Sequence, residues 1–132
     1  MTTSKRVLMA LMLVTAFVSP AHASNDQFRQ MLAQTGCDSK YNDDKKADLY
    51  SANYEGKPMS VTGSIKVLDG ADVSVKVLPS TFTFDVTVTL ADRKAAYNLE
   101  KGQRISLNFD VAGQGGCFLP FTGKHGVIAG SM

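Results

Sequence analysis

Residues 58–77 read PMSVTGSIKVLDGADVSVKV, and the pattern of this stretch points to a β-rich fold. Apolar and polar residues alternate along it with a period of two, which is typical of strands that bury one face. In the first half, the residues expected to point inward are Met59, Val61, Ile65 and Val67. Gly63 interrupts this inward row, and a glycine inside a strand indicates a bulge or a strong bend. A turn over 69–72 then leads into a second strand over 73–77.

The same alternation returns further along the chain. Pro79-Ser80 predicts a turn into a third strand, so that three consecutive strands form a meander. The later predicted strands are 82–90, 105–111 and a last strand, or pair of strands, from 117–121 and 127–128. Between them, residues 92–102 predict a short helix or helical turn, and the glycines of 113–116 predict another turn.

Upstream of these strands the apolar period is 3.6, which is typical of helices. Between Ser24 and Gly36, one helical face carries Phe28, Met31 and Leu32. A second helical stretch runs from about Asn42 to Tyr54, and one side of it carries Leu49, Tyr50, Asn53 and Tyr54. Two short helices therefore precede the strands.

The order of elements predicts the fold class. Five strands, with a bent first strand and a short helix between the third and the fourth, follow the order of an OB-fold barrel. We therefore expect a mainly β (α+β) protein, a small five-stranded OB-like barrel with N-terminal helices, formed by one domain over 24–132. A small open sandwich is the competing architecture.

Residues 1–23 have the pattern of a secretory signal peptide. Lys5-Arg6 precedes an apolar run from Val7 to Val18, and Ala21-His22-Ala23 forms an A-x-A site, so we expect cleavage after Ala23. The apolar run is 12 residues long, whereas a membrane-spanning helix needs about 20. We therefore expect no stable membrane span after leader removal, and a periplasmic or secreted protein. An uncleaved interfacial helix is the alternative.

Removal of this leader balances the charge of the chain. Lys5 and Arg6 are two of the 14 basic residues, and all 12 acidic residues lie downstream of them. The remaining 109 residues carry 12 charges of each sign. This balance does not favour nucleic acid or an anionic membrane as the partner.

Two cysteines remain in the exported part, Cys37 and Cys117. In an oxidising compartment an even number of cysteines favours disulfide formation, and two cysteines allow one intramolecular pairing. We therefore expect a disulfide between them. Two free buried thiols are the alternative.

Several short motifs indicate a family. They are Tyr41-Asn42, Ala47-Asp48, Tyr54-Glu55-Gly56-Lys57, Val61-Thr62-Gly63-Ser64-Ile65, Ala95-Ala96 and Leu99-Glu100-Lys101-Gly102-Gln103. With them, residues 41–128 resemble the exported OB-fold proteins called tRNA_anti-like. The resemblance implies a barrel fold. It supplies no catalytic residue, and a shared fold does not carry nucleic-acid binding with it.

The sequence offers little catalytic chemistry. His125 is the one histidine after the leader, in Gly123-Lys124-His125-Gly126, and no G-x-S-x-G motif surrounds a serine. A histidine in a surface turn is the simpler interpretation. The chain has no H-E-x-x-H or C-x-x-C motif, and the glycines of 113–116 lack the lysine of a phosphate-binding loop. We therefore expect no catalytic residue, no metal and no cofactor.

The expected binding surface is the one that OB-folds generally use. It consists of the outward face of strands two and three and the loops between strands one and two and between four and five. The residues expected there are Ser74, Lys76, Thr83, Asp85, Thr87, Gly70 and Gln114. Binding of single-stranded nucleic acid needs stacking aromatics and a basic groove, which this set lacks. A solvated β-face without a binding role is the alternative.

These observations favour a non-catalytic periplasmic or secreted binding module that engages another envelope protein, by strand addition at a barrel edge or through the first interstrand loop. One alternative is a binder of a small molecule or saccharide in the barrel mouth. Another is a small envelope enzyme or enzyme inhibitor.

Overall fold

The computed structural model describes residues 24–79 and 84–131. The helices are α2 (Ser24–Thr35) and α3 (Asp43–Asn53), with a 3-10 turn η2 (Arg93–Ala96). The strands are β1 (Pro58–Asp69), β2 (Asp72–Lys76), β3 (Val86–Leu90), β4 (Arg104–Gly113) and β5 (Phe121–Ser131). The predicted leader 1–23, its cleavage site at Ala23 and the predicted surface residue Thr83 lie outside the described residues. Among the described residues, no helix is long and apolar enough to cross a membrane.

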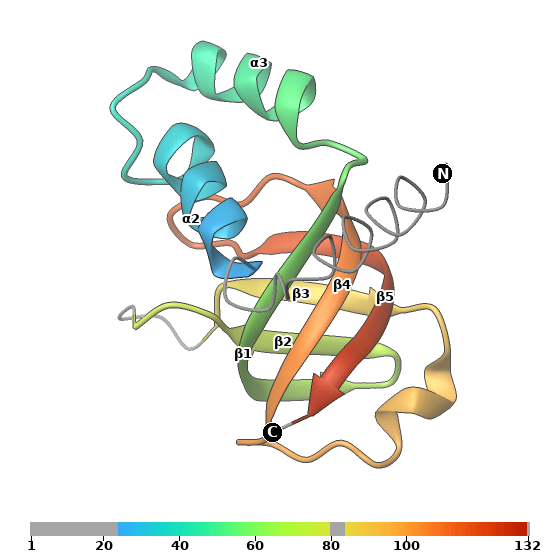
Figure 1. The fold of residues 1–132 in the computed structure, drawn as a ribbon. Helices are drawn as coiled ribbons and strands as arrows, with labels where there is room; N and C mark the ends of the chain where they lie inside the picture. The colour runs from blue at the N-terminus through green and yellow to red at the C-terminus, as the bar shows by residue number, and fades with distance from the viewer. Residues whose placement is uncertain (1–23, 80–83, 132) are drawn as a thin grey trace, which may run out of the picture.

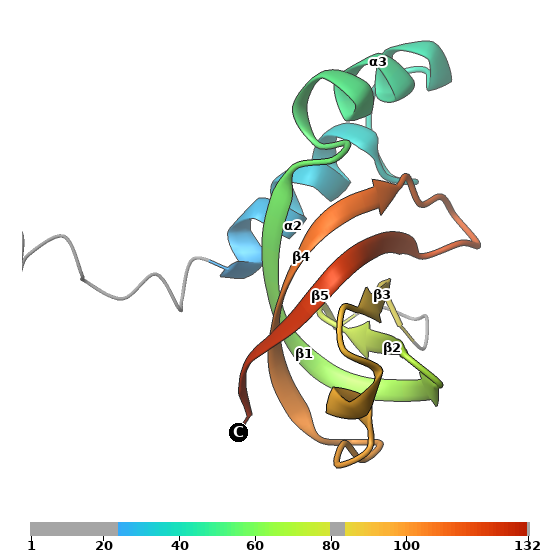
Figure 2. The ribbon, with the colours of Figure 1, turned by 90° about the vertical axis from the view of Figure 1, so that its right-hand side faces the viewer.

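The five strands close into a barrel in the order β1-β2-β3-β5-β4, which confirms the predicted mainly β, OB-like fold with N-terminal helices (Figure 1). All neighbouring strands pair antiparallel except β3 and β5, which pair parallel and complete the circle. Both views place α2 and α3 at the end of the barrel where β1 begins, and η2 at the opposite end (Figures 1 and 2).

Two predicted elements are shorter than expected. In the described part of the strand predicted over 82–90, Phe84 and Asp85 are not part of a strand, and β3 begins at Val86. The Asp85 carboxylate accepts the backbone N–H groups of Val77 and Leu78, at 2.6 and 2.9 Å, so a side chain takes hydrogen bonds that would otherwise extend the ladder. The helix predicted over 92–102 is reduced to η2.

The prediction that a strand includes 117–121 is wrong for 117–120. These residues form a loop, and β5 is one strand that begins at Phe121. The backbone N–H of Gly116 bonds to the carbonyl oxygen of Leu119 at 2.9 Å, which closes a turn in the loop. Pro120 has no N–H to donate to a ladder.

The first strand bends where it changes partners. Its first half pairs with β4 and its second half with β2, while Ser64 pairs with both. The register shifts between Ile65 and Val67, and an extra residue in a strand moves the following side chains to the other face. Val67, predicted to point inward, is therefore exposed, and Leu68 packs against the core instead.

The helix α2 closes one end of the core. Phe28 and Met31 are fully buried, as the helical pattern predicts, and the Phe28 ring meets the Phe121 ring edge to face at a centroid distance of 6.0 Å. The Asn25 side chain accepts the backbone N–H of Thr62 at 2.8 Å and donates to the carbonyl oxygen of Thr62 at 3.2 Å. These contacts fix α2 against β1.

A first prediction concerns the bend at Gly63. A Cβ atom there would collide with the carbonyl oxygen of Lys76 and lie 2.9 Å from the carbonyl carbon of Lys76, both of which are backbone atoms. We expect Gly63→Ala to lower the free energy of unfolding by about 1–3 kcal/mol, measured by urea unfolding. Gly130→Ala is the control, because its Cβ would have no heavy atom within 4 Å. Equal stability of the two variants would contradict this account.

A second prediction concerns Tyr50, whose buried hydroxyl has no hydrogen-bond partner among the described residues. Burial raises its pKa above the usual 10.0, and the Glu55 carboxylate raises this pKa further. The folded protein thus keeps this proton when the unfolded chain would lose it, so stability is complete below pH 10.0 and falls as the pH rises above it.

We expect Tyr50→Phe to keep or raise the free energy of unfolding at neutral pH, by up to about 1 kcal/mol, and to weaken the alkaline loss. Urea unfolding between pH 7 and pH 11 measures both effects. Burial also raises the pKa of Tyr54, so part of the alkaline loss will remain. A large destabilisation at neutral pH would show that the Tyr50 hydroxyl has a partner.

Candidate functional site

The predicted binding face is not a continuous solvated surface. Ser74, expected to point outward, is only 5% exposed, and its hydroxyl lies 2.8 Å from the Thr87 hydroxyl on the neighbouring strand. The prediction that Ser74 is exposed is therefore wrong, because cross-strand pairing buries its side chain. Lys76 and Thr87 are half-buried.

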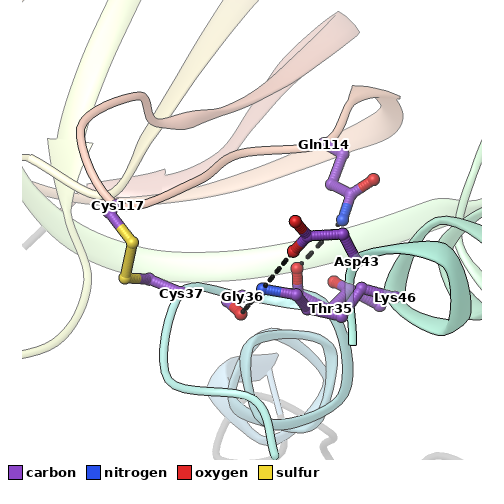
Figure 3. Close-up of a disulfide and its surroundings, with 7 residues drawn as sticks. All are labelled: Thr35, Gly36, Cys37, Asp43, Lys46, Gln114 and Cys117. Atoms are coloured by element: carbon purple, nitrogen blue, oxygen red, sulfur yellow. Dashed lines mark hydrogen bonds and ion pairs between the residues drawn. A yellow bond between two sulfur atoms is a disulfide. The ribbon is translucent and has the colours of Figure 1, made fainter. Parts of the chain in front are cut away.

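The other predicted residues have separate structural tasks. Asp85 fixes the chain after β2 through the two N–H groups described above. Gly70 occupies the left-handed region, with φ of 61°, in the tight turn from β1 to β2. The Gln114 amide donates to the carbonyl oxygen of Thr35 at 3.0 Å and ties the loop after β4 to the end of α2 (Figure 3). Gly70 precedes β2, whereas Gln114 follows β4, next to the start of β5, so the two do not form one surface.

The predicted disulfide between Cys37 and Cys117 is present, with Cα atoms 4.7 Å apart (Figure 3). It joins the segment after α2 to the loop between β4 and β5, across a sequence separation of 80 residues. Both cysteine residues are exposed. Together with the Gln114 bond, the disulfide attaches the loop 114–120 to the helical end of the barrel.

A hollow of about 320 Å³ on one side of the disulfide has paired polar groups (Figure 3). The Lys46 ammonium lies 3.4 Å from the Asp43 carboxylate and 3.4 Å from the carbonyl oxygen of Gly36. These contacts, with the bond from Gln114 to Thr35, connect α2, α3 and the loop. The groups in this hollow therefore serve to hold the three segments together.

The loop 114–120 presents two large apolar side chains to solvent. Phe118 is 90% exposed and Leu119 is 72% exposed. The sequence prediction missed them because it treated 117–121 as part of a strand, in which alternate apolar residues are buried. The nearby glycines and Pro120 are the signal that could have indicated an exposed loop.

An apolar groove of about 470 Å³ opens beside these side chains and the disulfide. Leu32 and Phe121 contribute to it from α2 and β5. The remaining apolar walls come from the segment after β2, with Leu78, Pro79 and Phe84, and from the loop, with Phe118, Leu119 and Pro120. Apolar lining with few polar groups is typical of surfaces that bind ligands or peptide segments.

His125 occupies a different part of the barrel from this groove. It lies within β5 rather than in a turn, in the left-handed region with φ of 56°, and its Nδ1 atom is 3.0 Å from Asp110 Oδ2. The side chain of His125 is 68% exposed, so its contact with Asp110 lies in solvent. Across residues 24–79 and 84–131, no serine, threonine or cysteine side chain forms a hydrogen bond with His125. The same residues contain no group of three side chains that could hold a metal ion.

A third prediction concerns the disulfide. We expect the double variant Cys37→Ser, Cys117→Ser to lose about 2–5 kcal/mol of unfolding free energy while its far-UV circular dichroism stays that of the barrel, because the strand ladder is closed without it. Urea unfolding with and without a reductant measures the effect. The reductant should destabilise the wild-type protein and leave the double variant unchanged; a fully unfolded double variant would contradict this expectation.

Comparison with protein families, with curated proteins and with solved structures gave no match. The resemblance to the tRNA_anti-like proteins therefore stays a prediction. The functional assignment depends on the chemistry of the disulfide-held loop and its groove.

Proposed function

We propose that this protein is a non-catalytic binding module of the cell envelope, periplasmic or secreted, which engages another protein through the loop 114–120 and the adjoining groove. The observation that carries the proposal is the exposure of Phe118 and Leu119 on a loop held by a disulfide. Large apolar side chains that gather on a surface favour a role in binding. Burial of an aromatic anchor supplies much of the affinity in many protein interfaces.

The attachment of the loop supports this role. The disulfide at Cys117 and the Gln114 bond restrict the loop at two points, and Pro120 restricts its backbone further. A binding loop that is ordered in advance loses less conformational entropy when the partner arrives. The same residues that limit the motion of the loop therefore favour its use as a contact surface.

The closed barrel favours the loop over strand addition as the mode of binding. Each of the five strands pairs with two neighbours for at least part of its length. Strand addition requires a free row of backbone N–H and C=O groups at a sheet edge. The tight turn at Gly70 has no large apolar side chain to offer, only Ala71, so the first interstrand loop is also the weaker candidate.

The proposed compartment agrees with the chemistry of the cysteines. Stable disulfides form in the periplasm or outside the cell and are rare in the cytosol. The bond between Cys37 and Cys117 and the signal-peptide pattern of 1–23 both favour export.

The groove also favours a second candidate function, the binding of a small apolar molecule. Its volume of about 470 Å³ lies within the range of small-molecule sites, about 300–1,000 Å³. Such a ligand would raise the melting temperature progressively as its concentration exceeds its dissociation constant, because it binds the folded state. A thermal-shift screen of small molecules therefore distinguishes the two functions.

A fourth prediction tests the proposed function by selection of random peptides displayed on phage against the purified protein. We expect the selected peptides to bind the wild-type protein and to lose at least tenfold in affinity, equivalent to about 1.4 kcal/mol, against Phe118→Ser. Tyr97→Ser is the matched control, because Tyr97 is 84% exposed and follows η2 at the other end of the barrel. Failure to select any peptide that depends on Phe118 would overturn the proposal.

A further inference from the structure

Of the described residues that line the apolar groove, the two charged ones are both acidic. They are Asp38, which follows the disulfide cysteine, and Asp85, which precedes β3. No lysine or arginine of the described residues lines the groove. The Asp85 carboxylate bonds to backbone N–H groups, so Asp38, which is exposed, is the more accessible of the two.

The lysines that follow Asp38 in the chain are directed to other partners. Lys46 contacts the Asp43 carboxylate and the carbonyl oxygen of Gly36. The ammonium groups of Lys40 and Lys45 lie over the Tyr41 ring, at 5.5 and 4.2 Å from its centroid. These lysines therefore do not form an ion pair with Asp38, and the rim of the groove keeps its negative charge.

From this charge pattern we infer that the partner segment is an apolar peptide that carries a lysine or arginine next to its apolar residues. This inference depends on the proposed function, because it specifies what the same groove accepts. The apolar residues pack against Phe118 and Leu119, and the cation pairs with Asp38. Opposite charges across an interface select the partner and its orientation. Phosphate-rich partners and acidic segments would be repelled by the same carboxylates.

The experiment uses the peptide that binds most tightly in the phage selection. Three synthetic forms are compared by fluorescence anisotropy: the peptide itself, a form with its basic residue replaced by glutamine, and a form with glutamate there. Each is titrated with the wild-type protein, with Asp38→Asn and with Asp48→Asn. Asp48 is the matched control, since it is an exposed carboxylate on α3 that does not line the groove.

We expect glutamine in place of the basic residue to weaken binding to the wild-type protein by about two- to fivefold, and glutamate to weaken it further. On Asp38→Asn the glutamine substitution should have little effect, because the charge with which the basic residue pairs is gone. Asp48→Asn should behave like the wild type. Added salt, at about 0.3 M, should reduce the difference between the peptides.

The possible failures are distinguishable. Selected peptides that are apolar without a basic residue, or that bind equally well with glutamate, would overturn the charge preference and leave the proposed function standing. Absence of any peptide that depends on Phe118 would overturn both. A dimer in sedimentation equilibrium that Phe118→Ser dissociates would assign the groove to a second copy of the chain and also overturn the inference.

Discussion

The whole barrel depends on one constraint in β1, which must serve two ladders at once. Its first half pairs with β4 and its second half with β2, so the strand has to bend sharply between them. Gly63 permits the bend because the backbone of Lys76 passes where a side chain would stand. With β1 bent, the parallel contact between β3 and β5 closes the circle, and the buried row of valines and isoleucines forms a continuous core.

The helical end of the barrel carries the candidate site because three segments meet there. The helix α2 buries Phe28 against Phe121, and β5 begins at Phe121 directly after the exposed loop. The disulfide and the Gln114 amide join that loop to the residues at and after the end of α2. Core packing on one side and covalent attachment on the other thus place Phe118 and Leu119 in solvent beside an apolar groove.

Much of the fold could be predicted from the sequence, since barrel strands bury one face and this burial produces the period of two. The exposure of Val67 could not be, because it follows from a register shift that pairing with β2 imposes. Burial of Ser74 likewise depends on Thr87 of another strand. The disulfide could be predicted from the number of cysteines. The exposure of Phe118 could not, because an apolar residue in an alternating stretch is normally assigned to the core.

The two hydrogen bonds between Asn25 and Thr62 have a second effect besides fixing α2. The amide of Asn25 offers one acceptor and one donor to the backbone of Thr62, as a neighbouring strand would, and so blocks this part of β1 against strands of other molecules. If cleavage follows Ala23, Asn25 is the second residue of the exported chain. The first turn of α2 therefore covers this part of β1, in addition to closing the core through Phe28 and Met31.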